Sequence, residues 1–327
     1  MTTTAEELTV SPLALVTGAS SGIGAAFAER LAADGYDLIV VGRREGRLRT
    51  LAASLAGVTT EVLVADLATD AGIDIVADVC ATRPLTMLVN NAGVAHYMPM
   101  ADLPAEKACE LLHVKVVAPA MLTRSALAGM LTRGSGTIIN VAGMLAFAGP
   151  APAAPPQGQR AIYVGSLAGT VAMTQTLHAE LAGTGVSAHV VCPGSVATEF
   201  HEVQGMDLSA VPRMSAADVV TAALAGIGLG EVVTAPGVQD TTLLSAVFTA
   251  DLAAFGGQSP HLAERYQARP GPPEPGATNL TLGTAAPHQI RGRSTHPLGE
   301  PAKTTSCGLR SHRRRRPAGD PVSVSDP

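Results

Sequence analysis

Residues 13–24 constrain the fold of this chain more than any other stretch. They read Leu-Ala-Leu-Val-Thr-Gly-Ala-Ser-Ser-Gly-Ile-Gly, an apolar run that ends in three closely spaced glycines, and an alanine-rich helical pattern begins directly after them. This order predicts a strand, a tight turn and a helix. A glycine-rich turn lets the backbone approach a pyrophosphate closely, and the N-terminus of the next helix offers free N–H groups and a partial positive charge. The segment therefore predicts a dinucleotide-binding site.

Apolar runs and helical patterns continue to alternate along residues 12–267. Strands are expected near 13–17, 37–41, 61–65, 86–89, 136–141, 187–192 and 231–235. Helices are expected over 23–34, 44–55, 70–81, 104–131, 161–183 and 215–226. Such alternation requires parallel pairing with right-handed crossovers. We therefore expect an α/β fold with one doubly wound parallel sheet, which binds its ligands at the carboxyl ends of the strands.

The two ends of the chain depart from this pattern. Residues 1–11 are expected to form a flexible N-terminus, and residues 12–267 a single domain for dinucleotide and substrate binding. Residues 268–327 carry nine Lys and Arg against four Asp and Glu, are rich in proline and have no sustained apolar period. That composition cannot bury enough surface to offset the entropy lost on ordering, so we expect a disordered basic tail. The arginine run 313–316 could bind nucleic acid, but without aromatic residues or a folded platform a solvated tail is favoured.

Composition favours a cytoplasmic protein. No apolar stretch reaches the roughly 18 residues typical of a membrane span. Residues 1–10 contain Glu6 and Glu7 but no basic region of a secretion signal. The four cysteines show no paired spacing and are expected to be reduced thiols. No Ser-His-Asp order, metal-ligand spacing or carboxylate pair indicates a hydrolase or a metal enzyme.

Four short motifs occur in succession along residues 12–267. The glycine turn has the form Thr-Gly-x-x-x-Gly-x-Gly at residues 17–24, and Asn-Asn-Ala-Gly at 90–93 comes after an apolar run. Tyr163 opens a long helical pattern, and Cys-Pro-Gly-Ser-Val-Ala-Thr at 192–198 comes after another apolar strand. In this order the motifs resemble those of the short-chain dehydrogenase/reductase family. The resemblance implies a Rossmann-like fold, a nicotinamide cofactor and an oxidoreductase activity on a carbonyl or alcohol.

The resemblance also implies which residues hold the cofactor. The glycine turn would contact the pyrophosphate, the end of the third strand the adenine, the Asn-Ala-Gly turn the ribose, and the segment after the sixth strand the nicotinamide. In that order the implied residues are Gly18, Ser20, Gly22, Ile23 and Gly24, then Asp66 and Leu67, then Asn90, Ala92 and Gly93, then Pro193, Gly194, Val196 and Thr198, with Tyr163 at the nicotinamide end.

The end of the second predicted strand favours NADP(H) over NAD(H). NAD enzymes commonly place an acidic residue here, which would repel a 2′-phosphate. This chain has Arg43 and Arg44 instead, and a guanidinium group offers a planar fork of donors that suits a phosphate. In the alternative interpretation, the two arginines only cap or decorate the next helix.

The catalytic positions of the family are mostly replaced. The family lysine, four residues after the tyrosine, lowers the tyrosine pKa and binds the ribose, and here that position is Leu167. The family serine position is Gly143, and the asparagine of the long fourth helix is Lys115. Only Tyr163 remains as a proton donor. A tyrosine with an ordinary pKa near 10 is a poor partner at neutral pH, so we expect a degraded or reorganised proton relay.

Three interpretations of these replacements stay open. In the first, Lys115 reaches into the volume that Leu167 leaves open and restores a cation near Tyr163; its alternative is a Lys115 that extends to solvent. In the second, the protein binds NADP(H) with little turnover and acts as a partner or sensor. In the third, it is a non-redox cyclase or isomerase that uses Tyr163 as an acid, because a fold does not fix a function.

Two histidines are further candidates for contact with the substrate. His96 lies just after the Asn-Ala-Gly turn, and His201 lies in residues 199–214, which are expected to cover the substrate. A lone histidine in a loop is more often a surface residue. The expected partner is a small-molecule substrate, and the family resemblance implies a homodimer or homotetramer that associates through the long helices 104–131 and 161–183.

Overall fold

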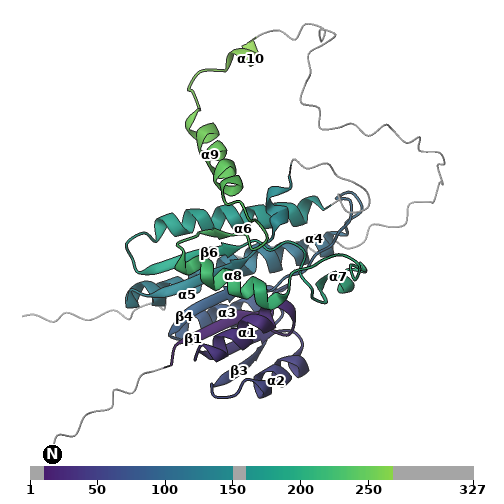
Figure 1. Ribbon diagram of the computed structural model, residues 1–327, viewed down its shortest axis with the longest axis vertical. Coiled ribbons are helices and arrows are strands. Elements are labelled where there is room, and N and C mark those ends of the chain that lie inside the picture. The colour runs from purple at the N-terminus through teal and green to yellow at the C-terminus, as the bar shows by residue number, and fades with distance from the viewer. Residues whose placement is uncertain (1–10, 150–159, 268–327) are drawn as a thin grey trace, which may run out of the picture. The chain divides into compact units, whose positions relative to one another are not determined.

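Alternating strands and helices make up residues 11–149 and 160–267, the residues that the computed structural model describes (Figure 1). Seven parallel strands form one sheet in the order β3-β2-β1-β4-β5-β6-β7. The strands are β1 (Leu13–Thr17), β2 (Asp37–Gly42), β3 (Thr60–Val64), β4 (Leu85–Asn90), β5 (Gly136–Val141), β6 (Val186–Val191) and β7 (Val233–Thr234). The doubly wound parallel sheet is therefore confirmed. The expected basic tail lies outside the described residues.

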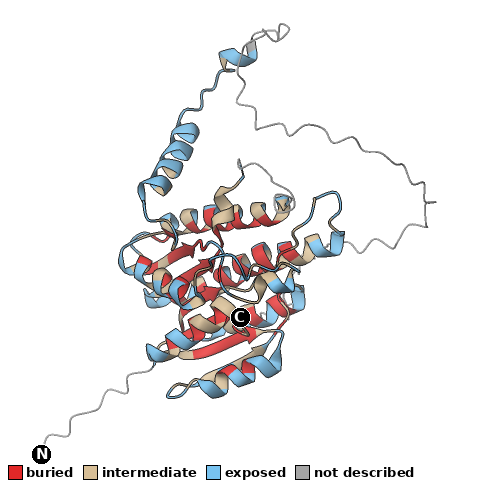
Figure 2. Cartoon of the chain, turned by 45° about the vertical axis from the view of Figure 1, so that its right-hand side comes forward, coloured by how far each residue is buried: buried red, intermediate tan, exposed pale blue. Residues whose placement is uncertain are grey.

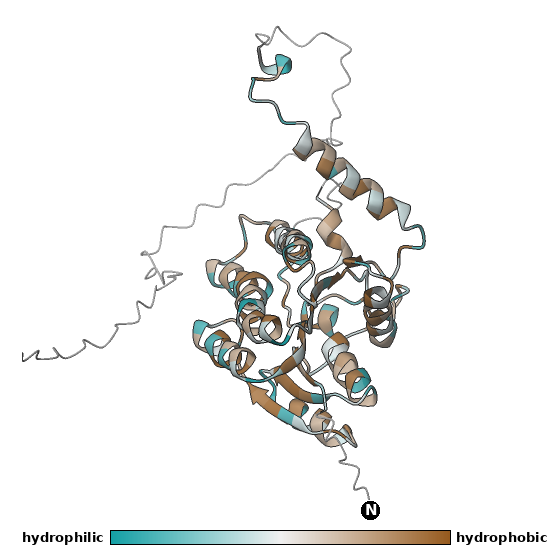
Figure 3. Cartoon of the chain, turned by 90° about the vertical axis from the view of Figure 1, so that its left-hand side faces the viewer, coloured by the Kyte–Doolittle hydropathy of each residue, from teal (hydrophilic) through white to brown (hydrophobic). Residues whose placement is uncertain are grey.

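Helices cover both faces of the sheet. They are α1 (Gly22–Ala33), α2 (Glu45–Ser54), α3 (Asp70–Thr82), α4 (Ala105–Leu112), α5 (Ala118–Arg133), α6 (Ala161–Glu180), α7 (Phe200–Val203), α8 (Ala216–Gly228), α9 (Thr242–Gly256) and α10 (Glu264–Gln267). α1, α2 and α8 pack on one face, while α3, α5 and α6 pack on the other. Because both faces are covered, the central strands are almost continuous apolar runs, and they are buried in Figure 2 and brown in Figure 3.

The long helix expected over 104–131 is interrupted by a change of helical geometry. α4 passes into a π-helical turn at His113–Val117, and α5 continues from it to Arg133. Such π turns occur frequently at functional sites, and this one contains Lys115. Ala105–Arg133 is long and apolar enough to cross a membrane by length and composition. α5 packs against α3 and β4 within the fold, so we give it no membrane assignment.

The site is positioned by the order of the strands. β1 lies between β2 and β4. The crossovers that leave β1 and β4 therefore run to opposite faces of the sheet, and the carboxyl ends of these strands border a crevice, as in other doubly wound sheets. The glycine turn comes directly after β1 and the Asn-Ala-Gly turn directly after β4, so the two motifs meet at this crevice.

Candidate active site

A cavity of about 780 Å³ opens at the carboxyl ends of the strands. Most residues that the sequence predicted for the site line it. These are Gly18, Ser20, Gly22, Ile23, Arg43, Arg44, Asp66, Leu67, Ala92, Gly93, Lys115, Gly143, Tyr163, Leu167, Pro193, Gly194, Val196, Thr198 and His201. Gly24, Asn90 and His96 are not among the lining residues.

The glycine turn is shaped so that only glycine fits. Gly18 and Gly22 have φ angles of +68° and +58°, which disfavour residues with a side chain. A Cβ on Gly18 would lie 2.8 Å from the Cα atom of Ala92, and one on Gly24 would collide with the carbonyl oxygen of Gly18. Gly24 therefore serves close packing inside the turn rather than the cavity wall, as the third glycine of such turns does.

Thr17 and Asn91 hold the two motifs together, although neither was among the residues expected to contact the cofactor. The hydroxyl oxygen of Thr17 accepts hydrogen bonds from the N–H groups of Asn91 and Ala92, at 2.9 and 3.0 Å. The side-chain amide of Asn91 donates to the carbonyl oxygen of Thr17 at 3.0 Å. These bonds fix the turn after β4 against the end of β1, so the cavity wall is rigid here.

Asn90 has a different role from the expected contact with ribose. Successive side chains of a strand point to opposite faces, so Asn90 shares the face of Leu88, which packs in the core with α5. Its amide nitrogen donates to Thr123 at 3.1 Å and to Asn140 at 2.9 Å. The side chain is therefore directed into the interior and braces β4 against α5 and β5.

Arg44 lies against the glycine turn. Its guanidinium donates to the hydroxyl of Ser20 at 2.8 and 3.0 Å and to that of Ser21 at 2.7 Å. It also forms an ion pair with Glu199, which binds Arg47 at 2.7 Å. The hydrogen bonds from Arg47 and then from Arg44 hold the pKa of Glu199 at about 2 against the opposing effect of burial. No motif marked Glu199 in the sequence, because its partners lie on distant elements.

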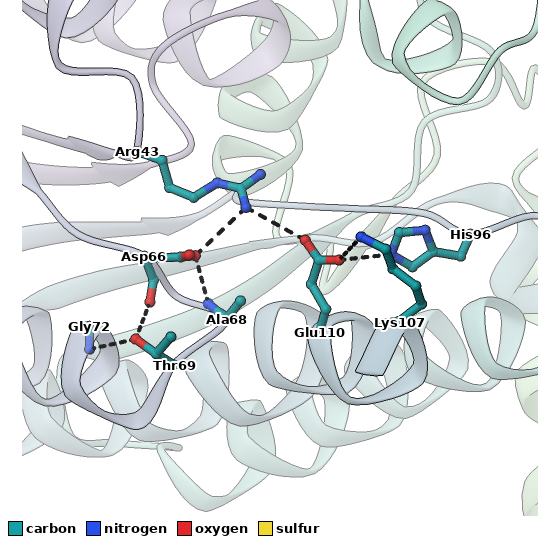
Figure 4. A network of polar contacts seen from close by, with 8 residues as sticks. All are labelled: Arg43, Asp66, Ala68, Thr69, Gly72, His96, Lys107 and Glu110. Carbon is teal, nitrogen blue, oxygen red and sulfur yellow. Dashed lines mark hydrogen bonds and ion pairs between the residues drawn. The ribbon is translucent and has the colours of Figure 1, made fainter. Parts of the chain in front are cut away.

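Arg43 belongs to a second network, which Figure 4 shows. Its guanidinium lies 3.8 Å from Asp66 and 3.5 Å from Glu110. Glu110 also binds His96 at 3.1 Å and Lys107 at 3.0 Å. Burial raises the pKa of Glu110, but these hydrogen bonds outweigh it and lower the pKa. His96 is thus directed to Glu110 rather than to the substrate region, because an acidic partner of α4 lies within its reach.

Tyr163 stands in the first turn of α6 with 7% of its surface exposed. The ring of Tyr97 meets it edge-on, with 5.3 Å between the ring centroids. The guanidinium of Arg160 lies 5.8 Å from the centre of the Tyr97 ring. Burial raises the pKa of Tyr163 well above 10, and interaction with Tyr97 raises it further, whereas the charge of Arg160 lowers it. Tyr97 and Arg160 both line the cavity, and no sequence motif indicated either.

Leu167 and Gly143, where the family resemblance implies a lysine and a serine, offer no polar side chain near Tyr163. Leu167 lies one turn further along α6 and is 1% exposed. Gly143 has an extended backbone, and a Cβ there would lie 3.5 Å from the carbonyl oxygen of Pro193 and 3.6 Å from Leu167. These are ordinary van der Waals distances. A serine would therefore fit at position 143, although its hydroxyl is absent.

Lys115 is a buried cation that also lines the cavity. It is 6% exposed, so the interpretation in which it extends to solvent is wrong. A Cβ on Gly93 would lie only 2.6 Å from its Nζ atom, which places the ammonium beside the Asn-Ala-Gly turn. Burial lowers the pKa of Lys115 to about 8. Within the described residues, its Nζ atom has no hydrogen-bond or ion-pair partner.

The remaining wall of the cavity is largely apolar. The segment after β6, which contains α7, contributes much of it. Its apolar lining residues are Phe200, Val203, Met206, Leu208 and Val211, opposite Met144 and Leu145. His201 also lines the cavity, and burial, with a smaller contribution from the charge of Arg213, lowers its pKa. Such a wall suits an apolar substrate.

Comparison with known proteins gives one consistent result. The family model described as short chain dehydrogenase matches residues 12–208. A putative ketoacyl reductase of Streptomyces coelicolor is 36% identical over 194 residues, 58% of this chain and 72% of that protein. A short-chain dehydrogenase from Sphingobium yanoikuyae in complex with NADPH has a TM-score of 0.73 at 32% identity, covering 78% of this chain and all of that one. A bulky-bulky ketone specific alcohol dehydrogenase from Comamonas testosteroni has a TM-score of 0.70 at 29% identity, covering 79% of this chain and 99% of that one.

Proposed function

Because the chain belongs to the short chain dehydrogenase family and is an oxidoreductase with a Rossmann-like nucleotide-binding fold, we propose that it uses NADP(H) to interconvert a carbonyl compound and an alcohol. The observation that carries this proposal is the convergence of three parts on one cavity. The glycine turn, the arginines after β2 and Tyr163 all line it. The apolar wall formed by the segment after β6 favours a bulky apolar substrate.

The residues present fit a dinucleotide. Gly18 and Gly22 of the turn line the cavity without a side chain, and the turn leads into the N-terminus of α1. The hydroxyl of Ser20 and the guanidinium of Arg44 lie at the same end of the cavity. Pro193, Gly194 and Thr198 would hold the nicotinamide. A bound nicotinamide cofactor supplies the hydride that the carbonyl carbon receives or loses.

The preference for NADP(H) rests on the charge at the end of β2. Arg43 is half-exposed at the cavity rim, where Asp66 and Glu110 orient it without burying it. Arg44 lies beside the hydroxyls of the glycine turn. Two guanidinium groups can bind a 2′-phosphate in a planar fork, and the ribose of NAD(H) offers no such group.

Tyr163 would donate the proton that the carbonyl oxygen takes up during reduction. Its hydroxyl must lose that proton more readily than a buried phenol normally does, and Leu167 supplies no charge for this. We assign the relocated cation of the site to Lys115. Its support is the buried Nζ atom beside Gly93, close to where the family resemblance puts the cofactor ribose.

One observation favours a second candidate function, the binding of NADP(H) without turnover. The pKa of Tyr163 is raised well above 10 by burial and by Tyr97, and a proton donor is most effective when its pKa lies near the working pH. A protein with this site could bind the cofactor and report its presence to a partner.

The deciding experiment is a titration with NADPH and NADH by calorimetry, and then turnover measurements on a panel of ketones and alcohols of increasing size. We expect NADPH to bind more tightly and to be oxidised with bulky apolar ketones, and Tyr163→Phe to abolish that oxidation without changing NADPH affinity. Tight binding with no oxidation across the panel would support the second candidate. Product formation with no change in nicotinamide absorbance would indicate a non-redox reaction, and failure to bind either cofactor would overturn the proposal.

A further inference from the structure

The site contains a pair of phenols that the family motifs do not account for. Tyr97, from the loop after β4, meets Tyr163 edge-on at 5.3 Å between ring centroids and an interplanar angle of 82°. The guanidinium of Arg160, the residue before α6, lies 5.8 Å from the centre of the Tyr97 ring. All three side chains line the same cavity. The buried Tyr163 therefore has the phenol of Tyr97 next to it, and the guanidinium of Arg160 lies next to Tyr97.

We propose that Tyr97 carries protons between Tyr163 and solvent, with Arg160 as the cation that stabilises the Tyr97 phenolate. The inference rests on the proposed carbonyl reduction. It assigns the return of the proton to Tyr163 to two residues that no family motif contains, and it is separate from the assignment of Lys115.

The steps balance as two proton transfers. During reduction the O–H bond of Tyr163 breaks, and an O–H bond forms on the carbonyl oxygen as its carbon receives the hydride. Tyr97 then gives its proton to the phenolate of Tyr163, so the negative charge moves to Tyr97, beside Arg160. Water restores the proton of Tyr97. In alcohol oxidation the same transfers run in reverse.

The direction of charge transfer depends on the surroundings of the two phenols. Tyr97 is less buried than Tyr163, so its phenolate costs less desolvation free energy. Burial raises the pKa of both phenols. Interaction with Tyr163 lowers the pKa of Tyr97 in part, whereas interaction with Tyr97 raises that of Tyr163 further. The charge of Arg160 lowers the pKa of both phenols.

The competing explanation is packing, because edge-on aromatic rings stabilise a core without any proton transfer. Tyr97→Phe distinguishes packing from proton transfer, since it keeps the ring and removes only the hydroxyl. With the proton path removed, we expect kcat for carbonyl reduction to fall by about 10²-fold, the lower end of the range typical of acid–base groups, with KM and NADPH affinity unchanged. Tyr36→Phe, just before β2 and outside the cavity lining, is the matched control and should leave kcat unchanged.

A second measurement needs no cofactor. The chain has four tyrosines and no tryptophan, so ultraviolet absorbance reports phenolate formation directly in the unliganded protein. We expect Tyr163→Phe to raise the pH at which Tyr97 ionises, and Arg160→Met to raise it as well, while Arg160→Lys restores the parent value. If Arg160 contributed only packing and its charge did not act on Tyr97, Arg160→Met would leave this pH unchanged.

The outcomes distinguish the relay from the proposed function. Unchanged turnover in Tyr97→Phe, or an ionisation of Tyr97 that neither Tyr163→Phe nor Arg160→Met shifts, would overturn the relay and leave carbonyl reduction standing. A parent protein that binds NADPH but reduces no carbonyl would overturn the proposed function and the relay together.

Discussion

At the scale of single residues, the lysine of the site lies on a different element from the one that the family resemblance implies. The resemblance implies a lysine at position 167 of α6, where this chain has a leucine that lines the cavity and is almost fully buried. Lys115 lies in the π turn and is buried beside Gly93. A buried ammonium without a partner costs folding free energy. The chain retains such a group at its cavity, which is the reason to expect a function for Lys115.

The first prediction concerns that cost. The pKa of Lys115 falls from 10.5 to about 8 in the fold, so the charged form is disfavoured by about 3 kcal/mol relative to the unfolded chain. Below pH 8 this penalty is fully present, and it disappears as the pH rises from 8 to 10.5. Lys115→Met should therefore raise the free energy of unfolding by about 3 kcal/mol at pH 7 and by little above pH 10.5. Urea titrations at both pH values measure this, with the exposed Lys107→Met as control.

The second prediction tests the role of Lys115 in turnover. If it serves as the relocated cation, Lys115→Asn alone should abolish carbonyl reduction, as measured by the oxidation of NADPH with one ketone. A Lys115→Asn variant that turns over like the parent would eliminate this assignment.

Restoration of the family residues is the third prediction. Leu167→Lys with Gly143→Ser and Lys115→Asn rebuilds the family set around Tyr163, and the space around position 143 admits the serine. If the parent is a damaged reductase, the triple variant should reduce carbonyls about 10²–10⁴-fold faster, the usual contribution of acid–base groups. Steady-state rates with one ketone, compared with the two-residue variants, would measure the gain. No gain in a folded triple variant would contradict a simple loss of catalytic residues.

The fourth prediction is that Arg43 selects the phosphorylated cofactor. One charge-assisted, partly desolvated pair is worth about 1.5–3 kcal/mol, or about a ten- to hundredfold preference for NADPH over NADH. Arg43→Ala should remove most of that preference, as measured by calorimetric affinities for both cofactors. Arg49→Ala, which removes an exposed arginine of α2 that pairs with Glu45, should retain it. Equal affinity of the parent for both cofactors would contradict the assignment.

At the scale of secondary-structure elements, two ion pairs connect the residue before α7 to the start of α2. Glu199 precedes α7 and binds Arg44 and Arg47, which lie at and just inside the start of α2. The same Arg44 contacts the hydroxyls of the glycine turn. Cofactor binding and the position of the segment that covers the substrate therefore share one arginine.

The fifth prediction comes from this sharing. Glu199→Gln frees Arg44 from a competing carboxylate, so NADPH affinity should increase about two- to fivefold, the gain expected from one partly exposed ion pair. Affinity for NADH should stay unchanged because it has no 2′-phosphate. Glu45→Gln removes the same charge from the outer side of α2 and is the control. An equal change for both cofactors would show that Glu199 acts on the fold and not on phosphate recognition.

At the scale of the whole molecule, the parallel sheet brings the residues of the candidate site together at the carboxyl ends of its strands. Residues 12–208, which match the family model, contain β1 to β6 and every motif of the site. Beyond residue 208, α8 packs beside α1, and β7 completes the sheet at its edge. α9 is apolar but has no buried residue in the described part of the chain.

The composition of residues 268–327 allows a prediction at this scale, although they lie outside the described residues. A chain that ends at residue 267 keeps every strand and the whole cavity lining. We expect it to melt within about 2 °C of the full chain and to bind NADPH equally well, because a proline-rich segment without apolar period adds little burial. A melting temperature several degrees lower would show that the segment packs, and a loss of nucleic-acid retention would assign it a binding role.

The sheet could be predicted from the sequence, and so could most of the residues that line the cavity. The apolar runs were long and regular, and the glycine turn needs φ values that glycine alone adopts easily, so these features are local. The cofactor contacts and the replacement of family residues by Leu167, Gly143 and Lys115 stay predictions. The end of the domain was harder to predict, because β7 has only two residues and the apolar α9 was not expected.

Only the tertiary structure decided the electrostatics of the site. Tyr97 and Arg160 come from separate segments and reach Tyr163 only because the loop after β4 and the start of α6 border one crevice. His96 likewise pairs with Glu110, and Glu199 pairs with two arginines, across segments that are distant in the sequence. The burial of Lys115 also depends on the packing of the folded chain around it. Local pattern determines which elements form, but the pKa of a side chain depends on the charges and the solvent that the folded chain places around it.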